Sequence, residues 1–183
     1  MDSVRVDRLV ETGAVEAVWL PFELHPDIPP EGVPRSAYFP PGRSRQIAEG
    51  MKALAAEAGL TMRERDRLVN SRLALATAEF ARERGAFGPV HRALFKVHWE
   101  GPGEVDDVEE LGRVVSDAGL DPSELTSALA GARYDGLLDA NRQEALAVGI
   151  NAVPAHIFGR RYLVVGAQPG EVYEQVLRKL AAA

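Results

Sequence analysis

The stretch that decides the fold lies near the end of the chain and reads Gly149-Ile150-Asn151-Ala152-Val153-Pro154-Ala155-His156-Ile157-Phe158-Gly159-Arg160-Arg161-Tyr162-Leu163-Val164-Val165-Gly166-Ala167-Gln168-Pro169. Two short apolar runs, 155–158 and 162–165, flank a Gly-Arg-Arg connection, and this pattern predicts a β-hairpin with a tight turn. Pro154 opens the first strand, where its missing N–H costs no central ladder bond. Gly166 to Pro169 ends the second strand and leads into a last helix, predicted over 170–182.

Composition restricts the class of protein. The chain has 183 residues, 46% of them hydrophobic and 26% charged, which is typical of a single globular domain. A net charge of -6 disfavours nucleic acid as a partner. No apolar run approaches the roughly 18 residues that span a bilayer, and residues 1–10 carry charge throughout, so we expect no membrane segment, no signal peptide and a cytoplasmic location.

The chain contains no cysteine. Disulfides, thiolate nucleophiles and thiolate metal ligands are therefore excluded for these 183 residues. We predict no catalytic residue, no cofactor and no metal site.

The first 43 residues predict one short helix, one strand and a proline-rich loop. Residues 4–10 predict a short helix, and residues 14–22 predict a strand with Val15, Ala17 and Trp19 on one face. Six prolines within residues 25–42 argue against any helix or paired strand there, so we expect an ordered surface loop.

The middle of the chain has helical periodicity. Six helices are predicted: 44–58 capped by Ser44, one capped by Asn70 that ends before Gly85, 90–100, one capped by Asp106 or Asp107 and closed by Gly119, 122–130, and 135–148. The strands at the two ends of the chain are expected to form one sheet, because neither can bury a face alone. The predicted fold class is α/β, a thioredoxin-like sheet with a large all-α insertion.

Several motifs carry a family resemblance. They are Trp19-Leu20-Pro21-Phe22-Glu23-Leu24-His25-Pro26, Asn70 at the start of the second inserted helix, Ala93-Leu94-Phe95, Ala118-Gly119-Leu120-Asp121, and Gly149-Ile150 to Val153-Pro154 with Gly166-Ala167-Gln168-Pro169. Together they resemble the DsbA-like thioredoxin family, in its FrnE-like branch near the hydroxychromene carboxylate isomerases and kappa-class glutathione transferases. The resemblance covers nearly the whole chain.

The resemblance implies a domain plan and a site. It implies one domain over 1–183, with 1–43 and 149–183 forming the thioredoxin-like part and 44–148 the helical insertion. The Val153–Pro154 bond is expected to be cis, and Val153 and Pro154 are expected to face an extended substrate. Asn70 lies near the pocket in relatives, although a helix-capping role explains this residue equally well.

The chain also departs from the family pattern. Members begin with a strand followed by Cys-x-x-Cys at a helix N-terminus, and this sequence shows neither feature before Trp19. Either the natural protein lacks them, or its start was placed too late. The family activity, thiol–disulfide exchange, needs a thiolate, so the chain as given is expected to be redox-inactive.

Two alternatives to an oxidoreductase stay open. One is a non-catalytic binding or assembly protein that holds a peptide or small molecule, with a homodimer formed through the exposed sheet. The other, an isomerase-like or polyketide-tailoring enzyme, rests on family analogy alone.

Three other features are interpreted structurally. Ala167 and Gln168 stand where glutathione-using relatives have Ser-Asp, so the segment before the last helix is expected to be a strand end and helix start rather than a glutathione site. His91 and His98 are interpreted as partly exposed helix residues rather than metal ligands. Residues 63–67, with their alternating charges, are expected to be solvated.

Overall fold

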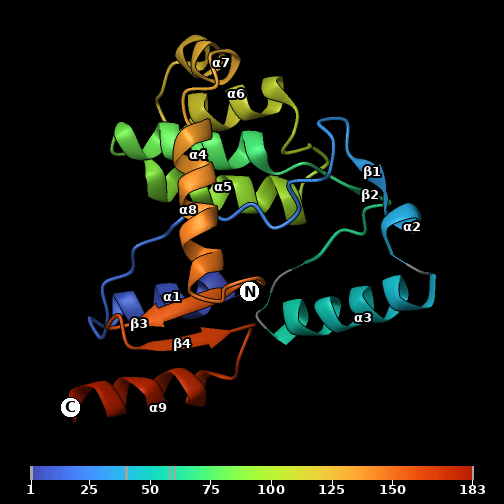
Figure 1. Cartoon of the computed structure of the whole chain (residues 1–183). Helices are drawn as coiled ribbons and strands as arrows, with labels where there is room; N and C mark the ends of the chain where they lie inside the picture. The colour runs from blue at the N-terminus through green and yellow to red at the C-terminus, as the bar shows by residue number, and fades with distance from the viewer. Residues whose placement is uncertain (1, 40, 58, 60, 183) are drawn as a thin grey trace. The chain divides into compact units, whose positions relative to one another are not determined.

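The computed structural model describes residues 2–39, 41–57, 59 and 61–182, and Figure 1 shows its ribbon. The elements in chain order are α1 (Asp2–Glu11), β1 (Val33–Pro34), α2 (Arg35–Tyr38), α3 (Pro41–Glu57), β2 (Arg67–Leu68), α4 (Arg72–Glu83), α5 (Phe87–Trp99), α6 (Val108–Asp117), α7 (Pro122–Ala130), α8 (Asp135–Ala147), β3 (Ala155–Phe158), β4 (Tyr162–Val165) and α9 (Gly170–Ala181). The predicted α/β class with a large helical part is confirmed.

The chain forms two compact units. Unit 1 consists of Met1–Leu24 and Asn141–Ala183, and unit 2 consists of His25–Ala140. Helix α8 begins in unit 2 and ends in unit 1. The division into a thioredoxin-like part and an insertion at residues 43/44 and 148/149 stays a prediction.

Unit 2 owes its core to four amphipathic helices, α4 to α7. Their apolar faces pack together, and the cluster includes side chains with no measurable exposure, namely Phe80, Ala81, Val90, Leu111, Val115 and Leu125. Two aspartates begin their helices as the sequence suggests: the Asp107 carboxylate accepts from Glu109 N–H at 2.9 Å, and that of Asp121 accepts from Ser123 N–H at 2.8 Å. The helical core is therefore both packed and capped.

Most predicted helices occur with small shifts at their ends. The predictions for α7 and, within one residue, for α9 are confirmed. Helix α3 begins at Pro41 rather than after Ser44, and Ala58 lies outside the described residues. Helix α5 begins at Phe87 rather than Val90, because Pro89 is tolerated in a first turn, where its missing N–H would have no intrahelical partner.

The proline-rich segment contains regular structure, so the expectation of neither helix nor paired strand there is wrong. Strand β1 pairs antiparallel with β2, with Val33 opposite Leu68 and Pro34 opposite Arg67. Arg35 N–H donates to Asp66 O at 2.7 Å, and the single turn α2 follows. The prolines limit these elements to two and four residues without preventing them.

Unit 1 contains the predicted hairpin with its predicted bounds. Strands β3 and β4 are antiparallel, with Ala155 opposite Val165 and Phe158 opposite Tyr162. At the turn Gly159 and Arg160 both have positive φ, 56° and 58°, and Arg161 N–H donates to Phe158 O at 3.0 Å. Two successive positive φ values are typical of the type I′ turn that matches the twist of a hairpin.

The predicted strand over residues 14–22 is wrong. Within the described part of the chain these residues join no strand ladder, and β3 and β4 form a sheet of their own. The single sheet expected from both chain ends is therefore absent among the described residues. Alternation of apolar and polar residues can give a strand one apolar face, but a strand also needs a neighbouring strand to pair with. Val18 and Leu20 in this segment are 79% and 69% exposed.

Candidate functional site

The candidate site begins where α8 ends. Gly149 has a φ of 85°, and Ile150 N–H donates to Ala145 O at 2.9 Å, so the chain leaves the helix by the reversal that glycine favours after a helix C-terminus. The Ile150 side chain is buried. These contacts hold the backbone just before Val153.

Val153 and Pro154, the predicted substrate-facing pair, lead directly into β3. The peptide bond between them is cis. Pro154 O accepts from Gly166 N–H at 2.7 Å, which extends the β3–β4 pairing by one bond, while the Val153 side chain is about half exposed. The pair is thus held by the hairpin and accessible to solvent; its role in substrate binding stays a prediction.

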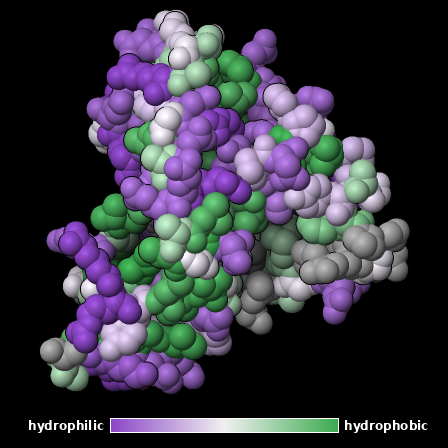
Figure 2. Space-filling model, in the orientation of Figure 1, coloured by the Kyte–Doolittle hydropathy of each residue, from purple (hydrophilic) through white to green (hydrophobic). Residues whose placement is uncertain are grey.

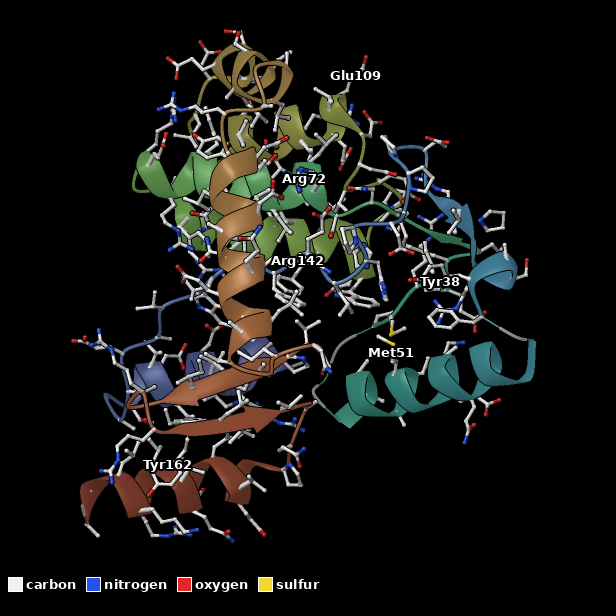
Figure 3. The ribbon with its side chains drawn as sticks, in the orientation of Figure 1. Tyr38, Met51, Arg72, Glu109, Arg142 and Tyr162 are labelled. Carbon is white, nitrogen blue, oxygen red and sulfur yellow. The ribbon has the colours of Figure 1, made fainter. Side chains whose placement is uncertain are left out.

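The hairpin has two different faces. On the first, His156 and Phe158 contact the buried Tyr173 of α9, with ring centroids 5.3 and 5.9 Å apart. Tyr162, labelled in Figure 3, lies between β4 and α9 on this face. The opposite face, which we call the open hairpin face, comprises Ala155, Ile157, Leu163 and Val165, and its three larger side chains are exposed.

Hydrophobic side chains gather over the hairpin on the surface seen in Figure 2. A contiguous exposed apolar surface is typical of a binding face. The open hairpin face offers apolar contact, and it carries no titratable side chain.

The segment before α9 is held by contacts within the protein. Gln168 Nε2 donates to Val165 O at 2.9 Å, Gln168 N–H points at the Tyr173 hydroxyl at 3.4 Å, and Arg5 donates to Gln168 O at 3.1 Å. The side-chain amide that could grip a ligand is engaged locally. These contacts support the structural interpretation of residues 166–169.

Asn70, the third predicted site residue, lies in unit 2, and both polar atoms of its side chain are bonded there. Its Oδ1 accepts from Arg72 N–H at 2.8 Å, as a helix-capping residue does, and its Nδ2 donates to Ile28 O at 2.5 Å. The side chain thereby joins the start of α4 to the proline-rich segment. A substrate role for Asn70 stays a prediction.

Residues 63–67 contain a buried cation that sequence reasoning missed. The Arg65 side chain is only 9% exposed and forms an ion pair with Glu104. Its guanidinium donates to His98 O, Val97 O and Gly103 O at 2.7, 2.8 and 2.8 Å. The expectation of a solvated run is therefore wrong for Arg65, which satisfies carbonyls left free at the C-terminal end of α5.

The two helix histidines occupy different environments. His98 lies next to Arg65, and burial, with a smaller contribution from that guanidinium, lowers the pKa of His98 from its usual 6.5 to about 4. His98 is half-buried within α5, as expected, but its lowered pKa was not foreseen. His91 stacks on Phe87 and meets Phe95 edge-on. Among the described residues no cluster of three or more His, Asp or Glu side chains could hold a metal ion.

A small polar cluster in the proline-rich segment also escaped sequence reasoning. The Tyr38 hydroxyl lies 2.8 Å from His25 Nδ1 and donates to Asp27 at 3.3 Å. Burial and, to a smaller extent, the Asp27 carboxylate raise the pKa of Tyr38. The cluster orders the loop; a proline-rich composition gives no signal for such a contact.

These features can be compared with known proteins. A profile of the DSBA-like thioredoxin domain matches residues 3–178. The chain therefore belongs to the DSBA-like thioredoxin domain family, and the open hairpin face and the Val153–Pro154 pair are features of a member without cysteine.

Two solved structures resemble the chain. The crystal structure of a "probable DsbA oxidoreductase" from Streptomyces coelicolor aligns with a TM-score of 0.86 at 27% identity, over 97% of this chain and 82% of that one. A "putative protein disulfide isomerase" from Nitrosomonas europaea aligns with a TM-score of 0.71 at 17% identity, over 99% and 89% of the two chains, and at that identity it speaks for the fold alone. No curated protein matches the chain. In the described residues no helix is both long and apolar enough to cross a membrane.

Proposed function

We propose that this 183-residue chain is a redox-inactive DsbA-family protein that binds extended polypeptide through unit 1. The observation that carries the proposal is the complete lack of cysteine in a chain whose family match runs from residue 3 to residue 178. Thiol–disulfide exchange begins with a thiolate attacking a disulfide. A chain without sulfur nucleophiles retains the scaffold and its binding surface but not that step.

The binding half of the proposal rests on exposure. Val153 and the open hairpin face present apolar side chains and strand backbone next to each other in unit 1. Unfolded polypeptide offers complementary groups, namely apolar side chains and unpaired backbone amides. Within the family we assign the chain to the FrnE-like branch, on the motifs taken together, of which Gly149-Ile150 to Val153-Pro154 with Gly166-Ala167-Gln168-Pro169 is the most specific. A cytoplasmic location is part of the proposal, and fractionation of expressing cells tests it.

The first experiment tests redox inactivity. The purified 183-residue chain is added to an insulin-reduction assay with dithiothreitol, beside thioredoxin as a positive control. We expect no acceleration over the reaction without protein. Any reproducible turnover by the chain alone sinks the claim of inactivity.

A second experiment tests binding. Fluorescein-labelled, reduced and carboxymethylated α-lactalbumin, which cannot refold or form disulfides, is titrated with the chain and followed by anisotropy. Saturable binding is expected, and native α-lactalbumin serves as the unbound control. Absence of saturable binding, or equal binding of the native protein, contradicts the proposed function.

Self-association is the competing use of the same surface. Sedimentation velocity over a wide concentration range decides between them. A monomer with the binding described above supports the proposal, whereas a stable dimer that loses polypeptide binding as it forms favours an assembly role.

A further inference from the structure

The outer edge of β3 is unpaired among the described residues. Gly166 N–H donates to Pro154 O, one position beyond the Ala155–Val165 pair. This bond makes Ala155–Val165 a pair whose own backbone groups point away from each other, and the alternation of an antiparallel ladder makes Ile157–Leu163 another. The N–H and C=O groups of Ala155 and Ile157 therefore point outward from β3, and those of Leu163 and Val165 point outward from β4.

No third strand uses these outward groups in the described part of the chain, where the sheet has the order β3–β4. The Ile157 side chain is 53% exposed, although it stands in the middle of a hydrophobic strand. An open edge beside an exposed apolar side chain is the combination that extended peptides exploit when they add a strand to a sheet.

The hairpin turn adds a charge to this edge. Arg160 and Arg161 are exposed directly beyond Phe158. Among the described residues neither guanidinium forms an ion pair, and the Arg161 guanidinium lies 5.8 Å from the Tyr162 ring centroid. A peptide that runs along β3 would carry the complementary charge where it passes this turn.

The size of the face argues for a peptide rather than a second copy. The open hairpin face has four side chains, whereas a stable protein–protein interface takes roughly 20–30 residues a side. A four-residue strand edge matches a short extended segment, which gains affinity from backbone hydrogen bonds and specificity from alternate side chains.

We propose that the outer edge of β3 takes an extended peptide strand of alternating apolar side chains with an acidic residue placed beside Arg160 and Arg161. This proposal rests on the proposed function and names the partner class and the binding mode. The peptide backbone pairs with the backbone of Ala155 and Ile157. Alternate side chains of the peptide then lie on the same side of the sheet as the open hairpin face, next to Ile157.

The test compares the two edges of one hairpin. Ile157→Pro removes an N–H that points outward from β3, and Leu163→Pro removes the corresponding outward N–H from β4. Neither removes a β3–β4 ladder bond, because both residues belong to the same outward-pointing pair. Leu163 is 42% exposed and Ile157 53%, so the two substitutions change similar apolar surface on the same face and remove N–H groups from opposite edges.

The probe is a fluorescein-labelled hexapeptide of alternating valine and threonine with glutamate at one end. Two peptides are made, one with the glutamate at the N-terminus and one with it at the C-terminus, because the added strand could run parallel or antiparallel to β3. We expect one placement to bind wild-type chain at least fivefold more tightly than its lysine counterpart. Ile157→Pro is expected to weaken that binding at least fivefold, and Leu163→Pro less than twofold. Equal losses in the two variants, or equal binding of the glutamate and lysine peptides, overturn the proposal.

A second measurement needs no protein variant. Two versions of the better peptide carry N-methyl groups on alternate amides, in the two possible phases. Only the peptide whose N-methyl groups replace the N–H groups that face β3 should lose binding. Loss of binding by both peptides, or by neither, contradicts strand addition. If the wild-type chain binds unfolded α-lactalbumin but no hexapeptide, the proposed function stands and this inference fails; if it binds neither, both fail.

Discussion

The two compact units treat their hydrophobic residues differently. In unit 2, Phe80, Leu111 and Leu125 are completely buried among four helices. In unit 1, Val18, Leu20 and Ile157 are among the most exposed large apolar side chains described. Unit 2 thus buries its large apolar side chains in its own core, whereas unit 1 leaves apolar side chains and strand backbone exposed to a partner. Binding is therefore expected in unit 1 and stability in unit 2.

The sharpest test of this contrast is a pair of truncations. Phe80→Ala empties a buried site in unit 2 and should destabilise the protein by about 4 kcal/mol, as core aromatic truncations do. Ile157→Ala removes a side chain already half in solvent and should cost less than about 1 kcal/mol. Urea unfolding measured by circular dichroism gives both values, and similar losses would remove the contrast between the units.

The next largest effect concerns the buried cation. Arg65→Met removes the donor of three carbonyl groups near the end of α5 and leaves Glu104 with the longer contact to Arg67 at 3.6 Å, so it should cost about 3 kcal/mol. Arg63→Met is the matched control, because Arg63 is exposed and its guanidinium donates to Gly101 O at 3.0 Å, while its backbone bond to Trp99 O survives the substitution. Chemical denaturation of the two variants side by side tests the difference, and a control as unstable as Arg65→Met would show that the effect is not local to Arg65.

His98 should make unit 2 sensitive to acid. Its folded-state pKa of about 4 lies below the usual 6.5, so the unfolded chain binds the proton first as the pH falls. The contribution is fully present above pH 6.5 and is lost as the pH falls to 4, amounting to at most about 3 kcal/mol for that shift. The free energy of unfolding of His98→Asn should therefore vary less over this window than that of wild type.

Carboxylates also titrate between pH 6.5 and 4, in wild type and in His98→Asn alike. Only the difference between the two curves of unfolding free energy against pH therefore reports on His98. Parallel curves from pH 6.5 to 4 would show that His98 titrates normally in the folded protein. An NMR titration of the His98 ring resonances provides the direct measurement.

The smallest effect tests the helix caps of unit 2. Asp107→Ala removes the acceptor of Glu109 N–H at the start of α6 and should cost about 1 kcal/mol. Asp107→Asn retains an oxygen acceptor and should recover most of the loss. If the asparagine variant is as unstable as the alanine variant, the carboxylate charge near the helix N-terminus matters more than the hydrogen bond.

What the sequence predicted well is local. The hairpin and α7 were predicted with their observed bounds, because strand alternation, turn residues, Asp121 and Pro122 act within a few positions. The same kind of signal restricted the cap of α6 to Asp106 or Asp107, and the structure has Asp107.

What the sequence missed depends on partners distant along the chain. Strand β1 exists because β2 lies beside it, more than 30 residues later, and the segment 14–22 is irregular for want of such a partner. Arg65 looked like one charge among several, and only the fold brings it to the end of α5. For the site, the sequence indicated Val153 and Pro154 through the family resemblance and an exposed sheet surface, but it did not show which side chains of the hairpin are exposed.

Gly159 at the hairpin turn has a consequence for how the family can diverge. A Cβ built there would lie 2.7 Å from Leu180 Cδ2 of α9, and the backbone has a φ of 56°. The residue types allowed at positions 159 and 180 therefore depend on each other, although these positions are 21 residues apart. In related sequences, we expect a residue larger than glycine at position 159 to occur together with a side chain smaller than leucine at position 180, so the two positions should covary.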